Sequence, residues 1–324
     1  MIRFRMKIFC LMIFLSVLSG FFWTPSSVAK DQFVAVVITG DLPRYKQAHE
    51  AFVNILHAGG LTEEKVRIYV QTPNPDPMSW ANSIRKAVGV GADLIVTYGA
   101  PVTLVAKKEA RGVPVLFADV YDPVALGIVK TLAISGGDIT GVSGKTPLTT
   151  LIKTFTEVKS VRSMGVLYSS NDQSSVHQVA ELAVSAGQNA FSLVKKDVNS
   201  PKDLPEALAG LSGNVDCLFV AESAVLNLEL QKIVDYSTKN NLPIISQIPG
   251  FSEMGALMTL EADPIEQGQL VGVHALQILT GQKVHTLPIR TPKKVALVIN
   301  LQTAKKMGIT IPFQALSMAT KVIK

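Results

Sequence analysis

The chain has 324 residues, 48% of them hydrophobic and 17% charged, with a formal net charge of +6. Residues 1–29 have the pattern of a cleaved leader. The remaining 295 residues carry a net charge of +3 and are enough for a large core and two domains. So mild a charge gives no reason to propose a nucleic-acid partner.

Residues 1–29 resemble a secretory signal peptide. Arg3, Arg5 and Lys7 form a positive start, an apolar segment follows over residues 8–18, and Ser27-Val28-Ala29 is a small-x-small cleavage site. We expect cleavage near Ala29 and a periplasmic or secreted protein. An uncleaved membrane anchor is the alternative, although the apolar segment is short for a span.

Cysteine use agrees with this interpretation. Only Cys217 remains after cleavage, so no internal disulfide can form, and a secreted chain of this size does not need one. Cys217 lies in the apolar segment 215–220, and we expect it to be a buried strand residue.

From residue 33 to residue 144, apolar runs alternate with segments of helical spacing. Runs bounded by Gly and Pro are typical of strands buried on both faces in parallel sheets. The expected strands are 33–39, 66–70, 93–97, 113–120 and 139–144, and the expected helices are 45–57, 79–88, 102–111 and 127–132.

The same alternation of apolar runs and helical segments resumes after an expected helix over residues 149–158. The expected strands are 164–168, 191–198, 215–220 and 242–246, and the helices between them are 175–186, 202–211 and 226–239. An apolar segment (255–260), a helix (264–279), a last strand (295–300) and a short helix (303–307) complete the chain. We therefore expect an α/β fold with two Rossmann-like lobes, and a chain that crosses between them several times.

No segment has the composition of a catalytic or metal site. Gly89-Val90-Gly91 precedes a strand instead of following one, so it cannot be a dinucleotide cradle. The five histidines are scattered, without the spacing of metal ligands. We expect neither an enzyme nor a cofactor.

The loops after the strands are the candidate ligand site, because ligands of open α/β sheets bind beyond the carboxyl ends of the strands. Gly99, Ala100 and Pro101 precede the helix from residue 102, and Ser174 and Ser175 open a helix in the opposite half. Helix starts with bare amides bind carboxylate or phosphate groups. Ordinary helix capping is the alternative explanation.

Further candidates end other strands. Asp122 could cap the next helix or accept a hydrogen bond from a ligand ammonium. Tyr98 and Tyr121 could stack on a flat ligand or be half-buried edge aromatics. Glu222, Ser223 and Gln247 end two strands of the second half.

Several segments resemble a known family, the ABC-transporter substrate-binding proteins typified by tryptophan- and tyrosine-binding members. These segments are DLIVTYGAP, VPVLFADVYDPV, GGDITGVSG, GVLYSSNDQSS, ADPIEQGQLVG and above all the close PKKVALVINLQTAKKMGITIP. They occur in the family's order over nearly all of the chain after residue 29.

The resemblance implies a type I periplasmic-binding fold, in which two lobes close on a ligand, and partners in a membrane permease and a cytoplasmic ATPase. The family's ligand loops fall on Gly99-Ala100-Pro101, Asp122, Ser174-Ser175, Glu222-Ser223 and Gln247. Amino-acid-binding members usually carry an acidic residue near Gln247. A neutral amide there pairs less well with an ammonium, so binding of an α-amino acid requires Glu222 or Asp122 to supply the charge.

We therefore expect a monomeric, non-enzymatic binding protein that traps a small polar or aromatic, amino-acid-like molecule by hinge closure. A ligand sensor that signals to a receptor or kinase is one alternative, and a secreted α/β enzyme is another. We expect lobe 1 to comprise residues 30–143 and 263–288, and lobe 2 to comprise residues 144–262 and 289–324.

Overall fold

The computed structural model describes residues 31–324, and Gln32–Lys324 form one compact unit. The expected signal peptide lies outside the described residues. Within residues 31–324, no helix is long and apolar enough to cross a membrane.

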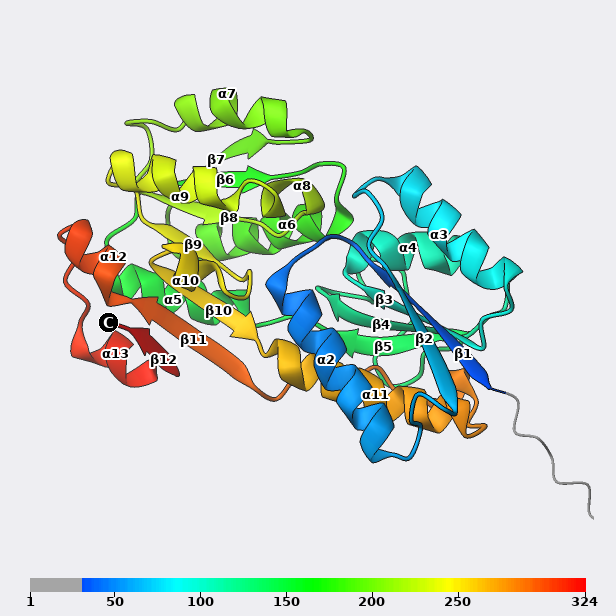
Figure 1. Ribbon diagram of the computed structural model, residues 1–324. Helices are drawn as coiled ribbons and strands as arrows, with labels where there is room; N and C mark the ends of the chain where they lie inside the picture. Colours follow the sequence, from blue (N-terminus) through cyan, green and yellow to red (C-terminus); the bar gives the residue numbers. More distant parts are fainter. Residues whose placement is uncertain (1–30) are drawn as a thin grey trace, which may run out of the picture. The chain divides into compact units, whose positions relative to one another are not determined.

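The first sheet has the strand order β2-β1-β3-β4-β5, and every neighbouring pair is parallel (Figure 1). Its central strands are fully or almost fully buried, as their apolar composition predicts. The strands are β1 (Gln32–Ile38), β2 (Val66–Gln71), β3 (Leu94–Tyr98), β4 (Val115–Val120) and β5 (Ile139–Ser143), and the helices are α2 (Pro43–Ala58), α3 (Pro77–Gly89), α4 (Ala100–Glu109) and α11 (Pro264–Leu279).

Alternate residues of β1 fill two different cores. Phe33 and Val37 face α3 and α4, whereas Val34 and Val36 face α2 and α11. This alternation is what a strand covered on both faces requires. Helices α2 and α11 cross closely (Figure 1), since a Cβ at Gly268 would lie 1.9 Å from the carbonyl oxygen of Ala48.

The second sheet has the order β12-β11-β10-β9-β8-β6-β7. Its strands are β6 (Ser163–Tyr168), β7 (Ser192–Asp197), β8 (Cys217–Val220), β9 (Ile244–Ser246), β10 (Met258–Ala262), β11 (Val295–Asn300) and β12 (Lys321–Ile323). The remaining helices are α5 (Leu148–Val158), α6 (Gln173–Gln188), η1 (Pro201–Asp203), α7 (Leu204–Ala209), α8 (Ala224–Asn227), α9 (Leu230–Lys239), α10 (Phe251–Met254), η2 (Val284–Thr286), α12 (Leu301–Lys306) and α13 (Phe313–Met318).

Both faces of this sheet are also covered. Helices α5 and α6 pack on one core, and α7, α9 and α10 contribute to the other. Cys217 is fully buried in the first of these cores, which confirms its expected role as a strand residue.

Three segments connect the two sheets. The chain passes from β5 to α5 through residues 144–147, from β10 to α11 through Asp263, and from η2 to β11 through residues 287–294. The fold is therefore two α/β sheets joined by several chain crossings.

Three details differ from the sequence-based expectation. The expected helix over residues 127–132 is wrong, because turns and bends occupy this segment and Gly127 has a φ of +63°. Strand β10 pairs antiparallel with β11, so the second sheet is not wholly parallel. Helix α13 and strand β12, at the end of the chain, were not predicted.

Candidate functional site

A small polar cavity lies beyond the carboxyl ends of strands from both sheets. Its volume is about 10 Å³, the space of about one water molecule. Asp119 of β4 meets there with residues from the segments that follow β1, β3, β6 and β8. Its lining comprises Thr39, Tyr45, Ala100, Pro101, Asp119, Asp172, Ser174, Glu222, Ser223, Ala224 and Asn227.

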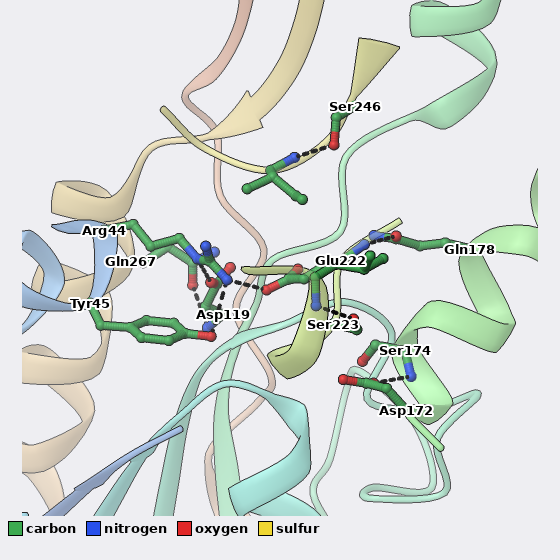
Figure 2. A network of polar contacts seen from close by, with 12 residues as sticks. Arg44, Tyr45, Asp119, Asp172, Ser174, Gln178, Glu222, Ser223, Ser246 and Gln267 are labelled. Carbon is green, nitrogen blue, oxygen red and sulfur yellow. Dashed lines mark hydrogen bonds and ion pairs between the residues drawn. The ribbon is translucent and has the colours of Figure 1, made fainter. Parts of the chain in front are cut away.

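Arg44, beside this cavity, links the two sheets. It lies in the first turn of α2, and its side chain is only 5% exposed. Its Nε donates to Asp119 Oδ2 at 2.9 Å, and its Nη2 donates to Glu222 Oε1 at 2.5 Å (Figure 2). Because Asp119 belongs to the first sheet and Glu222 follows β8 of the second, one guanidinium holds both sides together.

The backbone of Asp119 is unusual for a strand residue. Its φ is +53°, and the pairing register of β4 with β5 shifts between Phe117 and Val120. Its N–H donates to Gln267 Oε1 at 3.2 Å, and Gln267 donates in turn to the carbonyl of Ser143. The irregularity aims the carboxylate at Arg44, and strain of this kind is common at ligand sites.

Negative charge exceeds positive charge around the cavity. Asp119, Asp172 and Glu222 line it, whereas Arg44 is the guanidinium that pairs with two of them. Burial, together with the charge of Asp119, raises the pKa of Glu222 to about 8. Burial likewise raises the pKa of Asp172 to about 6, against the backbone hydrogen bonds that it accepts. We call Arg44, Asp119, Asp172 and Glu222 the cleft cluster.

Three polar atoms of the cavity lining have no hydrogen-bond partner within the described chain. They are Thr39 Oγ1, Ser174 Oγ and Asn227 Oδ1, and the three side chains are at most 8% exposed. Buried polar groups are normally satisfied. The cavity therefore offers hydrogen bonds that a bound molecule would complete.

The loop at Gly99 is shaped for close packing. Gly99 has φ +94°, and a Cβ there would lie 2.6 Å from Tyr45 Oη and 2.7 Å from Thr39 Oγ1. Its N–H already donates to the carbonyl of Ala118, and Pro101 has no N–H. The expected free amide is therefore wrong for Gly99.

The helix start at Ser174 is also occupied from within the chain. The N–H of Ser174 donates to Asp172 Oδ1 at 3.0 Å, and the Oγ of Ser175 accepts from the N–H of Ser169. Ser223 caps the short helix α8 by accepting from the N–H of Leu226. Among the side chains of Ser174, Ser175 and Ser223, the hydroxyl of Ser174 is the one without a partner within the described chain.

Other predicted site residues lie in a second cluster near the linker from β5 to α5. Tyr121 Oη donates to Glu181 Oε2 at 2.7 Å. Lys145 binds both Asp122, at 2.7 Å, and Glu181. Asp122 also accepts from the N–H of Ala125, in the manner of a cap. We call Tyr121, Asp122, Lys145 and Glu181 the linker cluster.

Tyr98 and Gln247 also lie outside the cavity lining. Tyr98 is fully buried, and its ring is 6.1 Å from the rings of Tyr45 and His49. The Nε2 of Gln247 donates to the carbonyl and the hydroxyl of Thr146, at 2.9 and 2.7 Å. Gln247 therefore binds the linker instead of facing Glu222.

Of the predicted residues, Ala100, Pro101, Ser174, Glu222 and Ser223 share one cavity. The sequence analysis missed Arg44, Asp119, Asp172 and Asn227. Arg44 and Asp172 follow strands, so they could have been found by the rule that ligands bind beyond the carboxyl ends of strands (the strand-end rule). Asp119 lies within a strand and Asn227 within a short helix, and only the folded chain shows that they reach the cavity.

Larger hollows also occur in the described chain, and one of them shares Asn227 with the small cavity and is lined by Arg44. One of about 600 Å³ lies along α4 and the turns after β4, and one of about 980 Å³ lies between the start of α2 and strands β10 and β11. The small cavity is distinguished by its place at the strand ends of both sheets. It is small because Arg44 and Glu222 are in contact.

Comparison with known proteins identifies the family of the chain. Residues 33–323 match the family model described as ABC transporter substrate binding protein. A tyrosine-binding protein of Clostridioides difficile (strain R20291) is 26% identical over 269 residues, which are 82% of this chain and 77% of that protein.

Solved structures share the fold. An ABC domain in complex with L-Trp from Streptococcus pneumonia is 24% identical and has a TM-score of 0.87, over 90% of this chain and all of that one. A ligand-free, open substrate binding protein with adhesive properties from Clostridium difficile is also 24% identical. It covers 90% of this chain and 99% of its own, but its TM-score is 0.69.

Proposed function

The chain belongs to the family of ABC transporter substrate-binding proteins, and we propose from this premise that it captures a small amino-acid-like molecule, polar or aromatic, for an ABC importer. The molecule would bind between the two sheets at the ends of their strands. The chain would act by binding and release, without chemical change of the ligand.

The observation that carries the proposal is the contact of Arg44 with Asp119 and Glu222. It joins the two sheets at the edge where α/β folds bind ligands. A contact of this kind can form only when the two sides approach. The contact therefore supports a cleft that closes on its ligand.

We further propose that the two sides are lobes that move about the three linkers. Lobe 1 would comprise residues 30–143 and 263–288, and lobe 2 would comprise residues 144–262 and 289–324. Hinge closure around a ligand needs only a few residues that absorb the change of backbone angles. Support comes from the higher TM-score with the L-Trp complex than with the open, ligand-free structure, at equal sequence identity.

The ligand class rests on relatives and on charge. One relative is named a tyrosine-binding protein, and one similar structure contains L-Trp. In this chain Gln247 binds Thr146, so Glu222 is the residue that would supply negative charge to a ligand ammonium. Glu222 would thus take the role that the amide at position 247 cannot fill for an amino-acid ligand.

The partners would be a membrane permease and a cytoplasmic ATPase, which receive the closed, ligand-loaded protein as a monomer. Export and cleavage near Ala29 would place the chain in the periplasm or outside the cell, as the pattern of residues 1–29 indicates.

A thermal unfolding screen tests the proposal. The protein produced from the full-length coding sequence is partially unfolded and refolded to remove carried-over ligand, then heated with amino acids, amines, nucleobases, short peptides, sugars or oxyanions. A ligand at a hundred times its Kd stabilises the folded state by about 2.7 kcal/mol. For a chain of this size, that raises the Tm by about 5–10 °C.

A rise with amino acids or amines, and with no other class, supports the proposal. Glu222→Gln should reduce that rise, whereas the matched surface variant Glu109→Gln should leave it unchanged, because Glu109 pairs only with exposed Arg85. A rise with sugars or oxyanions alone would contradict the proposed ligand class.

A further inference from the structure

The cavity between Asp172 and Glu222 has the character of a site for one positively charged group. It is small, lined by three carboxylates and bordered by a guanidinium that is already paired. Its volume of about 10 Å³ holds one group of the size of water or ammonium.

The unpartnered atoms indicate which kind of group fits. Asn227 Oδ1 is an acceptor, so only a hydrogen-bond donor can satisfy it. The hydroxyls of Ser174 and Thr39 can either donate or accept. An ammonium group has three donors and no acceptor, whereas a carboxylate would leave Asn227 Oδ1 unsatisfied.

Two amides at positions suited to an anion are already used within the chain. The N–H of Gly99 donates to Ala118, and the N–H of Ser174 donates to the carboxylate of Asp172. Pro101 removes a further amide from the start of α4. An anionic ligand group would meet Asp172 and Glu222 with few free donors to offset their charge.

We infer that the substrate carries a positively charged nitrogen that binds between Asp172 and Glu222 and completes the hydrogen bonds of Ser174 and Asn227. A primary ammonium group is thus the required feature of the substrate, and an α-carboxylate is dispensable. The inference rests on the proposed function, since it assigns the ligand of the same cleft.

Arg44 would stay in place when the ammonium binds. It contacts Glu222 Oε1 and Asp119, and it does not line the cavity. The body of the substrate needs more space than the closed cavity gives. It would enter while the two sides are apart, and closure would then bring Glu222 onto the ammonium.

Matched analogues separate the two charged ends of an amino acid. The probes are L-tyrosine, tyramine and 3-(4-hydroxyphenyl)propionate, L-tryptophan, tryptamine and indole-3-propionate, and L-leucine, isoamylamine and 4-methylvalerate. Each is titrated calorimetrically into the protein produced from the full-length coding sequence. In the series that binds, the amine should keep its affinity within about tenfold of the amino acid, and the deaminated acid should lose about a hundredfold or more.

Variants test the residues. Glu222→Gln and Asn227→Leu should weaken amine binding by about tenfold or more, while Glu109→Gln should not. The Tm of each variant without ligand shows whether it has folded. If a variant does not fold, the analogue series still decides the inference, because it uses the unaltered protein.

The outcomes separate this inference from the proposed function. If the deaminated acid binds as well as the amino acid, the ammonium site is wrong while the binding function stands. The same conclusion follows if Glu222→Gln binds amines normally, in which case the cavity holds only water. If all nine compounds and the wider thermal screen give no binding, the proposed function fails, and this inference with it.

Discussion

Two charged clusters join the same two sheets, and both have more carboxylates than cations. In the cleft cluster, Arg44 is 5% exposed and its partners Asp119 and Glu222 are 12% and 16% exposed. In the linker cluster, Lys145 is 36% exposed, and Asp122 and Glu181 are 20% and 35% exposed. The two clusters therefore contain similar charged groups, but the cleft cluster is buried and the linker cluster is partly exposed to water.

This difference in burial determines what each cluster can do. Water screens the linker cluster, so its ion pairs stabilise the fold weakly. The cleft cluster is desolvated, so its charges are costly unless they are paired. A buried site with unpaired polar atoms suits a ligand, whereas a half-exposed one suits a hinge.

The largest expected contrast is between Arg44→Met and Lys145→Met. Removing Arg44 leaves the buried carboxylate of Asp119 without a counter-ion and Glu222 without its hydrogen-bond donor, which should lower the free energy of unfolding by about 3–5 kcal/mol. Removing Lys145 should cost about 0–1 kcal/mol, because its partners remain hydrated. Urea unfolding measures both. An equal loss of unfolding free energy in the two variants would contradict the claim that burial distinguishes the two clusters.

The packing around the cavity gives a second contrast. Gly99→Ala forces a side chain into a backbone angle that favours glycine and against Tyr45 and Thr39, so we expect a loss of about 1–3 kcal/mol. Gly40→Ala is the matched control, because a Cβ there meets no atom within 4 Å and the backbone angle is ordinary. Thermal unfolding of both variants should show a loss for the first alone.

The two clusters should respond oppositely to pH. The raised pKa values of Glu222, about 8, and Asp172, about 6, mean that the folded chain binds protons which the unfolded chain releases. Their contribution to stability therefore falls as pH rises from 5 to 8. The hydrogen bond from Ala125 and the charge of Lys145, against burial, lower the pKa of Asp122. Its contribution is lost only as pH falls below about 4.

Paired variants isolate these effects from other titrating groups. The stability difference between wild type and Glu222→Gln should change by on the order of 1–2 kcal/mol between pH 5 and 8. The difference between wild type and Asp122→Asn should stay level over that range and change only in acid. A level difference for Glu222→Gln would show that this carboxylate is not desolvated.

The smallest effect concerns Gln247. Gln247→Asp removes hydrogen bonds to Thr146 and should lower the free energy of unfolding by about 0.5–1.5 kcal/mol. It should not strengthen amine binding, because Glu222 and Asp172 are the residues that line the cavity. Calorimetric titration with the amine that binds checks this prediction. A clear gain in affinity would show that the ligand ammonium binds at position 247 instead of between Asp172 and Glu222.

Most of the architecture could be predicted from the sequence. Buried apolar runs such as those of β3 and β4, separated by segments of helical spacing, identify a parallel α/β sheet without further information. The segment 127–132 was misassigned because its apolar residues mimic a short helix, while Gly127 turns the chain. The antiparallel pairing of β10 with β11 follows from a long-range crossing, which local pattern does not encode.

The candidate site could be predicted only in part. The strand-end rule located Ser174, Glu222 and Ser223, since strand ends are visible in the sequence. The rule could not show that the fold already uses the amides of Gly99 and Ser174, because their acceptors, Ala118 and Asp172, are known only from the folded chain. Asp119 was missed because its orientation depends on an irregular backbone within β4, which no local pattern reveals.

The most direct test of the central claim is hydrogen exchange of the protein with and without the compound that raises its Tm most. We predict that exchange slows at the strand-end loops around residues 97–101, 119–122, 170–176 and 220–228, on both sides of the cleft cluster. Protection confined to the hollow along α4, with these loops unchanged, would contradict a ligand held between the two sheets.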